Sequence, residues 1–233
     1  MTTPSTNNKL YTNAVSTDTS THKTQHQHVF NQIYNYGGWK TFPWTPKSGS
    51  GSSLKNTQKY RQLLTSIINN NDINKVVDFG YSDWTFSSHI DWSKVKYLGI
   101  DVTQSIVEDN QKKYRKSNID FVCVDLTVDD NVEIRSHIPD FNCRGIPQAD
   151  LWIIKDVFQH WSNAEITKFL SRLMKCKAFK WLLITNSYTK GKNVDIQVGG
   201  FRSLNPLESP LKEFNPQIVL NEGNKCVCLI TTK

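Results

Sequence analysis

Short apolar runs alternate with longer amphipathic stretches from residue 75 onward. Strands are predicted at residues 76–79, 97–100, 120–124, 150–154 and 181–185, and helices at about 103–114 and 164–174. Alternation at this spacing favours a parallel sheet covered by helices on both faces. Two final apolar runs, 217–220 and 225–231, flank a hairpin-type turn at 221–224. We therefore predict a Rossmann-like α/β fold with a seven-stranded, mostly parallel sheet and an antiparallel C-terminal hairpin.

The first 28 residues differ from the rest of the chain. Thr, Ser, Asn, Gln and His dominate them, and apolar residues are few. Such a segment buries too little surface to offset the entropy of ordering. We therefore predict a disordered tail over 1–28 and one domain over 29–233. His22, His26 and His28 belong to this tail on that interpretation, and we assign no metal site.

A glycine- and serine-rich segment, Ser48-Gly-Ser-Gly-Ser-Ser53, runs directly into a predicted helix at 54–68. Ser52 or Ser53 is the expected N-cap of this helix. The amides at a helix start attract anions, so Ser50, Gly51 and Ser52 are candidates for holding a carboxylate or phosphate.

Acidic residues follow four of the predicted strands. Asp78 and Gly80 end the first strand, and Asp101 ends the second about 20 residues later. In open α/β folds, a strand that ends in an acidic residue and a glycine turn forms a cofactor crevice, and the next acidic strand end binds a ribose. Asp125 and Asp156 end the third and fourth strands. The pattern predicts a cofactor that contains a nucleoside.

Composition adds weaker constraints. A formal net charge of +7 admits an anionic partner, but the chain has no dense Lys/Arg block. The five cysteines form no C-x-x-C pair, which favours reduced thiols in a cytosol-type compartment. No apolar run approaches the roughly 18 residues of a membrane span, and no signal-peptide core is present. We expect a soluble, intracellular, cytoplasmic protein that does not bind membranes.

The ordered motifs carry a resemblance to a known family. They are Ser48-Gly-Ser-Gly-Ser-Ser-Leu54, Asp78–Trp84, Lys155-Asp156-Val-Phe-Gln-His160, Asp195-Ile196 and Gly199-Gly-Phe-Arg202-Ser-Leu-Asn205. Over roughly residues 48–232 the chain resembles class I S-adenosylmethionine-dependent methyltransferases, and within them a bacterial-type small-molecule family linked to sugar O-methylation. Lys155 departs from the family, which has Arg there, and Tyr81-Ser82 stands where smaller residues are usual.

The resemblance implies S-adenosylmethionine as the cofactor. Asp83 is expected to bind its ammonium group, Asp101 both ribose hydroxyls and Asp125 the adenine amino group. Alternatively, Asp83 caps a helix and Asp101 caps a turn. The full expected cofactor set is Ser50, Gly51, Ser52, Asp78, Gly80, Asp83, Trp84, Asp101, Asp125 and Leu126.

Catalysis is assigned to Asp156, His160 and Lys155. Transfer of a methyl group to a hydroxyl needs a proton acceptor, and histidine titrates near neutrality. Substrate contacts are expected from Asp195, Arg202 and Asn205 in the loop after the fifth strand, and from Trp39 by stacking.

The preferred function is therefore O-methylation of a sugar hydroxyl in a glycan or nucleotide sugar. One alternative is an RNA cap or ribose 2′-O-methyltransferase, because Lys155, Asp156, Lys190, Lys192 and Glu222 vaguely match a Lys-Asp-Lys-Glu catalytic set. Nucleic acid is a less favoured partner because no continuous basic stripe is present. Another alternative is an inactive module that only binds the cofactor. The oligomeric state stays open.

Overall fold

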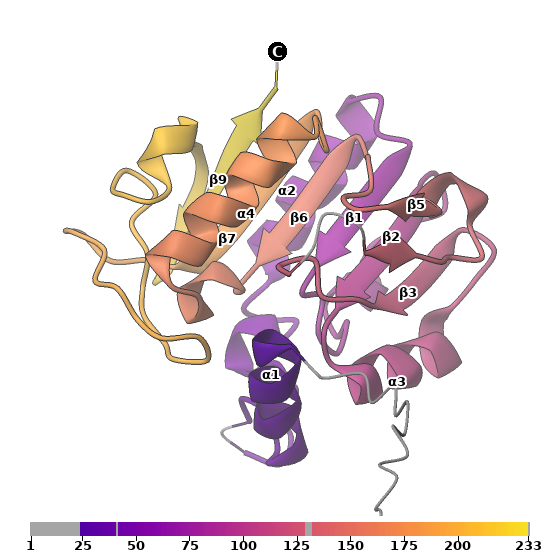
Figure 1. Cartoon of the computed structure of the whole chain (residues 1–233), viewed down its shortest axis with the longest axis horizontal. Coiled ribbons are helices and arrows are strands. Elements are labelled where there is room, and N and C mark those ends of the chain that lie inside the picture. The colour runs from indigo at the N-terminus through magenta and orange to yellow at the C-terminus, as the bar shows by residue number, and fades with distance from the viewer. Residues whose placement is uncertain (1–23, 41, 129–131, 233) are drawn as a thin grey trace, which may run out of the picture.

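The computed structural model describes residues 24–40, 42–128 and 132–232, and seven strands in it form one twisted sheet (Figure 1). The strands are β1 (Lys75–Phe79), β2 (Lys96–Asp101), β3 (Ile119–Cys123), β6 (Leu151–Lys155), β7 (Trp181–Ser187), β8 (Gln217–Glu222) and β9 (Lys225–Thr231). Their order is β3-β2-β1-β6-β7-β9-β8, and β9 runs antiparallel to both of its neighbours, β7 and β8, while the other pairs are parallel. The predicted fold, with its C-terminal hairpin, is confirmed.

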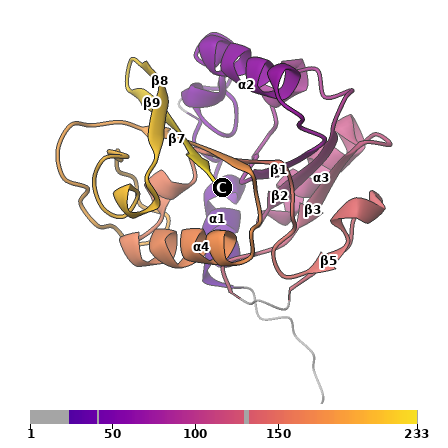
Figure 2. The same ribbon diagram turned by 90° about the horizontal axis from the view of Figure 1, so that it is seen from above.

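Helices cover both faces of the sheet (Figure 2). They are α2 (Gln58–Asn70) and α3 (Gln104–Tyr114) on one face and α4 (Asn163–Lys175) on the other. Neighbouring residues of β1 show the division, because Val76 joins the core under α2 and α3 while Val77 joins the core under α4. A strand buried on both faces reads as a continuous apolar run, which is why the sequence pattern located the strands well.

Helix starts were predicted less well. Ser162 and Glu165 form a capping box that fixes the start of α4, one residue before the predicted position. The expected cap of α2 at Ser52 or Ser53 is wrong, because a 3-10 turn at Ser50–Ser52 and a further turn precede the helix. Thr57 occupies the N-cap position and donates its hydroxyl to the Ser53 carbonyl. The first amides of α2 therefore lie beyond the glycine-serine segment.

Helix α1 (Gln25–Asn35) lies across the carboxyl edge of the sheet, below it in Figure 1. It begins within the predicted tail, so the boundary expected at residue 29 is wrong; residues 1–23 lie outside the described residues. Thr24 and Gln27 form a capping box. His26 is buried against Trp161 and pairs with Glu165 at 2.8 Å, so it is a packing residue. The composition of residues 1–28 alone does not show that the start of α1 packs against the rest of the domain.

The remaining elements are small. A two-stranded sheet of β4 (Glu133–Ile134) and β5 (Cys143–Arg144) was not predicted, and residues 188–216 connect β7 to β8 without an α-helix. All five cysteines are free thiols. Within the described ranges, none of the helices has both the length and the apolar character needed to cross a membrane.

Candidate active site

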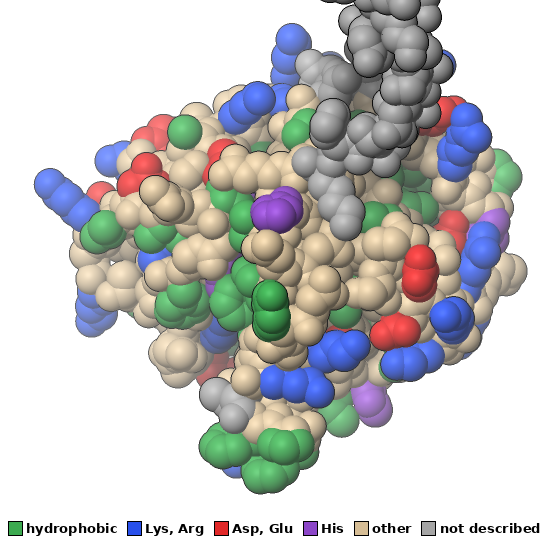
Figure 3. Space-filling model, turned by 60° about the horizontal axis from the view of Figure 1, so that its bottom comes forward, with side chains coloured by type: hydrophobic (Ala, Val, Ile, Leu, Met, Phe, Trp, Pro, Cys, Tyr) green, Lys and Arg blue, Asp and Glu red, His purple; other side chains and the backbone are tan. Residues whose placement is uncertain are grey.

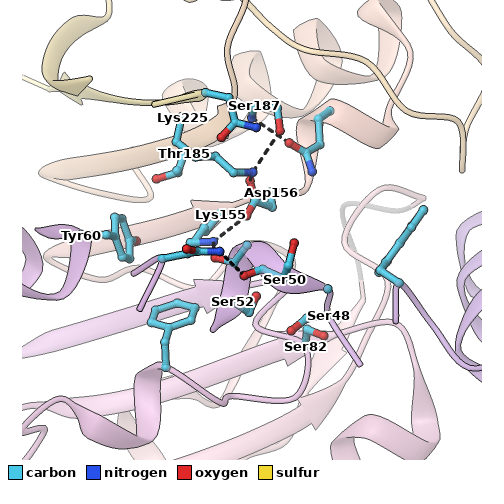
Figure 4. Close-up of a pocket in the computed structure, with 18 of the residues that line it drawn as sticks. Ser48, Ser50, Ser52, Tyr60, Ser82, Lys155, Asp156, Thr185, Ser187 and Lys225 are labelled. Carbon is cyan, nitrogen blue, oxygen red and sulfur yellow. Dashed lines mark hydrogen bonds and ion pairs between the residues drawn. The ribbon is translucent and has the colours of Figure 1, made fainter. Parts of the chain in front are cut away.

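A cavity of about 700 Å³ opens at the carboxyl edge of the sheet (Figure 4). Its walls come from the tips of β1, β6 and β7, the start of β9, and the segment Ser48–Ser52. Parallel strands bring their carboxyl ends to one edge, where open α/β folds bind ligands. Its volume lies in the range of pockets that bind small molecules.

Asp156, directly after β6, holds its carboxylate between two ammonium groups in this cavity. Lys155 Nζ lies 2.5 Å from Oδ2, and Lys225 Nζ lies 2.5 Å from Oδ1. Lys225 also donates to Ser187 Oγ at 3.0 Å. The φ angle of Asp156 is 60°, a conformation that costs energy for a non-glycine residue and is found at functional sites. Both carboxylate oxygens are therefore engaged by the protein itself.

Lys225 was missed by the sequence reasoning. Because β9 runs antiparallel to β7, its first residue lies at the carboxyl edge, where Lys225 pairs in register with Ser187. The predicted hairpin contained this signal, since the residue that follows its turn had to return to the edge where the parallel strands end.

The electrostatics of this trio favour the ion pairs. Burial by itself raises the pKa of Asp156, but Lys155 and Lys225 outweigh this effect and lower it. Burial lowers the pKa of Lys225; Asp156 opposes that shift and Lys155 reinforces it. Lys155 is further held by aromatic rings, with Nζ 5.2 Å from the Phe86 centroid and 5.9 Å from that of Tyr60.

His160 lines the same cavity from the 3-10 turn Phe158–His160, so the expected pairing of Asp156 and His160 in one cleft is seen. Its Nδ1 lies 2.7 Å from the Gly200 carbonyl and must donate to it. Gln159 accepts from the Ser187 amide, which leaves its side-chain NH₂ 3.3 Å from His160 Nε2. Burial lowers the pKa of His160, so the neutral ring with a lone pair on Nε2 is favoured. Trp39 stacks on this ring at 4.3 Å between centroids and lines the cavity as well.

The β1 tip contributes Asp78 and Gly80. Burial raises the pKa of Asp78 to about 7, although the Tyr97 hydroxyl, which donates to it at 2.6 Å, opposes the shift. Gly80 has a φ of 73°, and a Cβ there would lie 2.4 Å from Val157 Cγ2. The glycine is therefore required by Val157 as well as by its backbone conformation, a reason the sequence reasoning did not include.

Asp101 lies at the end of β2 beside a second cavity of only about 70 Å³. Its carboxylate accepts from the amides of Ser82 at 3.2 Å and Thr103 at 2.9 Å, as the turn-cap alternative proposed. Helix α1 covers this crevice, and its Tyr34 hydroxyl bonds Ser82 Oγ. Helix α1 therefore closes the crevice at the end of β2.

Four expected cofactor residues do not line either cavity. Asp83 accepts from Ser48 and Thr85. The alternative that it caps the following helix is wrong, because Phe86 occupies the N-cap position of the 3-10 turn Ser87–His89. Trp84 is a core residue whose indole N–H donates to Tyr97 at 2.7 Å, so its assignment to the cofactor site is wrong. The carboxylate of Asp125 is occupied by Thr24 and Thr127, and Leu126 is fully buried.

The expected substrate loop is held by hydrogen bonds, both within the loop and to Trp161 and Asn163. Arg202 is buried and donates to the carbonyls of Val194 and Trp161. Asp195 accepts from the amides of Asn163 and Ile196. Asn205 bonds Gly191 and Leu207. None of the three predicted residues lines the large cavity, and instead Phe201 of this loop does.

Comparison with known proteins identifies the fold. No protein-family model matches the sequence, and no curated protein matches it significantly. Magnesium protoporphyrin IX methyltransferase (ChlM) from Synechocystis PCC 6803, solved with bound S-adenosylmethionine, is similar with a TM-score of 0.56 and 14% identity, over 91% of this chain and 93% of that one. The PH0226 protein from Pyrococcus horikoshii OT3 is similar with a TM-score of 0.56 and 13% identity, over 88% of this chain and 100% of that one. The mitomycin 7-O-methyltransferase MmcR is similar with a TM-score of 0.50 and 12% identity, over 76% of this chain and 54% of that one. The chain therefore has the class I methyltransferase fold.

Proposed function

We propose that this protein is an S-adenosylmethionine-dependent methyltransferase that methylates a hydroxyl of a sugar, in a glycan or a nucleotide sugar. The observation that carries the proposal is the cavity that runs from Asp78 and Gly80 to Asp156, with acidic and basic groups at its centre. ChlM, a methyltransferase with a similar fold, was solved with this cofactor bound.

The cavity fits the methionine half of the cofactor. The glycine turn at Gly80 lets the backbone approach a ligand, and Ser50, Gly51 and Ser52 face it across the cavity. The nucleoside half belongs near Asp101, where α1 leaves only about 70 Å³, so α1 must shift when the cofactor binds. When bound, the cofactor would supply an electrophilic methyl group on a sulfonium.

The protein's own residues would hold and deprotonate the acceptor. His160 Nε2 is the better proton acceptor, because both oxygens of Asp156 are engaged by lysines. As the methyl group is transferred from sulfur to oxygen, His160 Nε2 would take the proton of the acceptor hydroxyl in place of its long contact with Gln159. The hydroxyls of Tyr60 and Thr185 are buried beside each other in the cavity wall, and neither has another hydrogen-bond partner among the described residues. They are available to a polyhydroxy acceptor.

One observation favours the RNA ribose alternative. Lys155, Asp156, Lys225 and Glu222 all line the cavity, which resembles a Lys-Asp-Lys-Glu set in which Lys225 replaces the exposed Lys190 and Lys192. Against it, Glu222 pairs with Lys59 at 2.9 Å. Steeply salt-dependent binding of a single-stranded RNA would select this alternative over the sugar.

Calorimetric titration with S-adenosylmethionine tests the proposal. We expect 1:1 binding by the wild-type protein and at least tenfold weaker binding by Asp101→Asn, with Asp72→Asn, an exposed carboxylate, as the control. No binding by a folded wild-type protein would overturn the proposal. Binding without turnover on any acceptor would instead favour the inactive module. The proposal includes a cytoplasmic location, which rests on the reduced cysteines.

A further inference from the structure

Two aromatic side chains protrude from the loop between Trp39 and Ser48, two residues that line the large cavity. Phe42 and Trp44 stack in parallel, with ring centroids 5.2 Å apart and planes 4° apart, and they remain 57% and 79% exposed. They belong to residues 42–47, here called the aromatic loop. In Figure 3, hydrophobic side chains form a protruding knob at the lower end of the face.

The aromatic loop has a defined shape. Thr45 donates from its amide and its hydroxyl to the Phe42 carbonyl, at 3.0 Å and 2.8 Å, which closes a tight turn beneath the rings. The Trp39 amide donates to the Lys47 carbonyl at 2.8 Å and closes the neck of the loop. Ser48 is tied to the Asp83 carboxylate by its amide and its hydroxyl. This hydrogen-bonded turn keeps the Phe42 and Trp44 rings exposed to solvent. Exposed apolar side chains in a fixed position indicate a binding surface.

The neck connects the aromatic loop to the reaction centre. Trp39 and Ser48, which flank it, both line the cavity. Trp39 stacks on His160, and Phe201, also at the cavity wall, lies 5.8 Å from the same ring between centroids. A ligand whose reacting oxygen lies beside His160 would therefore leave the cavity along aromatic surfaces that lead toward the loop.

We propose that the aromatic loop binds a second sugar unit of the acceptor, so that the substrate is an oligosaccharide or glycan chain rather than a free monosaccharide. This inference rests on the proposed function. A sugar ring has an apolar face of C–H groups that matches one aromatic ring in size. A single-stranded nucleic acid, which would need cations along its path, is a competing outcome of the test below.

The test compares monosaccharides with the corresponding disaccharides and trisaccharides as acceptors, using the full chain and tritium-labelled S-adenosylmethionine. We expect the wild-type protein to show a KM about tenfold lower for the longer sugar, a size consistent with one or two aromatic contacts. Trp44→Ala and Phe42→Ala should abolish that ratio. The matched control is Val128→Ala, which removes an exposed apolar side chain that lines neither cavity. This variant should keep the wild-type KM ratio.

A second readout needs no turnover. In protein labelled with 5-fluorotryptophan, the Trp44 fluorine resonance, assigned with Trp44→Phe, should shift on adding the trisaccharide. It should not shift with a 12-nucleotide oligouridine or with vesicles of three parts phosphatidylcholine to one part phosphatidylglycerol.

The outcomes are distinguishable. A wild-type ratio that Trp44→Ala leaves intact, or a resonance that responds to RNA or vesicles instead of sugar, overturns the inference alone. If no saccharide is methylated or bound while the cofactor still binds, the sugar acceptor and the inference both fail. Absence of cofactor binding overturns the proposed function itself.

Discussion

Lys225 Nζ lies 2.5 Å from Asp156 Oδ1, although 69 residues separate them in the chain. The contact exists because β9 returns antiparallel along β7 and delivers its first residue to the carboxyl edge. Together with Lys155, it places two cations around one carboxylate where the proposed methyl transfer takes place.

Lys225→Met should lower kcat by about 100-fold, the size found when one preorganised polar group is removed from a reaction centre. Cofactor affinity should change less than threefold, because the ammonium group of Lys225 bonds Asp156 and Ser187 and not Asp78 or Asp101. Steady-state kinetics with labelled cofactor, together with calorimetry, measure the two effects separately.

The matched control is Lys180→Met, which removes an exposed lysine paired with Asp150 at 2.7 Å at the opposite edge of the sheet. It should leave kcat within twofold. Equal rates for the two variants would remove Lys225 from the reaction centre.

The sequence predicted the parallel part of the sheet well because its five strands are buried on both faces and so form uninterrupted apolar runs, as Val76 and Val77 do. It also placed Asp156 and His160 in one cavity, since both follow the tip of a parallel strand closely. The sequence pattern was sufficient wherever the place of a residue along a single strand decided which site it joins.

It failed where a distant segment decided the environment. Trp84 follows the glycine turn, but its indole is buried in the core, where its N–H donates to the Tyr97 hydroxyl. The Asp125 carboxylate is taken by Thr24 of a segment that composition assigned to a disordered tail. Lys225 depended on strand pairing rather than on any motif. Such contacts follow from tertiary packing, which single-segment patterns do not contain.

The stability of the protein should depend on the ionisation of Asp78. Its raised pKa of about 7 means that the folded protein holds the proton more tightly than the unfolded chain, where aspartate titrates near pH 4. Stability from this group is therefore complete below about pH 4 and is lost as the pH rises to about 7. Between pH 5 and 8, Asp78→Asn should lose less free energy of unfolding than the wild type, as measured by urea denaturation. Identical losses in both proteins would contradict the buried, protonated carboxyl.

His160 should control the acid limb of the rate profile. Because burial lowers its pKa below the ordinary value, kcat/KM should be flat at neutral pH and fall only in more acidic solution, as the ring becomes protonated. His160→Gln should lower kcat at least 100-fold and remove that limb. A variant with wild-type rates would assign the proton to another group.

Helix α1 should limit cofactor entry. It covers the crevice beside Asp101 and is linked to the β1 tip through Tyr34 and Ser82. In stopped-flow measurements the observed binding rate should therefore level off at high cofactor concentration, and Tyr34→Phe should raise that plateau severalfold. Tyr36→Phe, which changes an 89% exposed ring just after the same helix, should leave it unchanged. A rate that stays linear in cofactor concentration would show that α1 does not gate the crevice.

Arg202 should prove structural rather than substrate-binding. Its guanidinium is buried and donates to the Val194 and Trp161 carbonyls, so Arg202→Met leaves two acceptors without their donor. We expect a loss of about 2–3 kcal/mol in the free energy of unfolding, with KM of the folded protein unchanged. Arg135→Met, at a side chain 83% exposed, should cost less than about 0.5 kcal/mol. Unchanged stability with a tenfold higher KM would instead restore the substrate role that the Gly-x-x-Arg motif predicted, and would require the loop to rearrange around the acceptor.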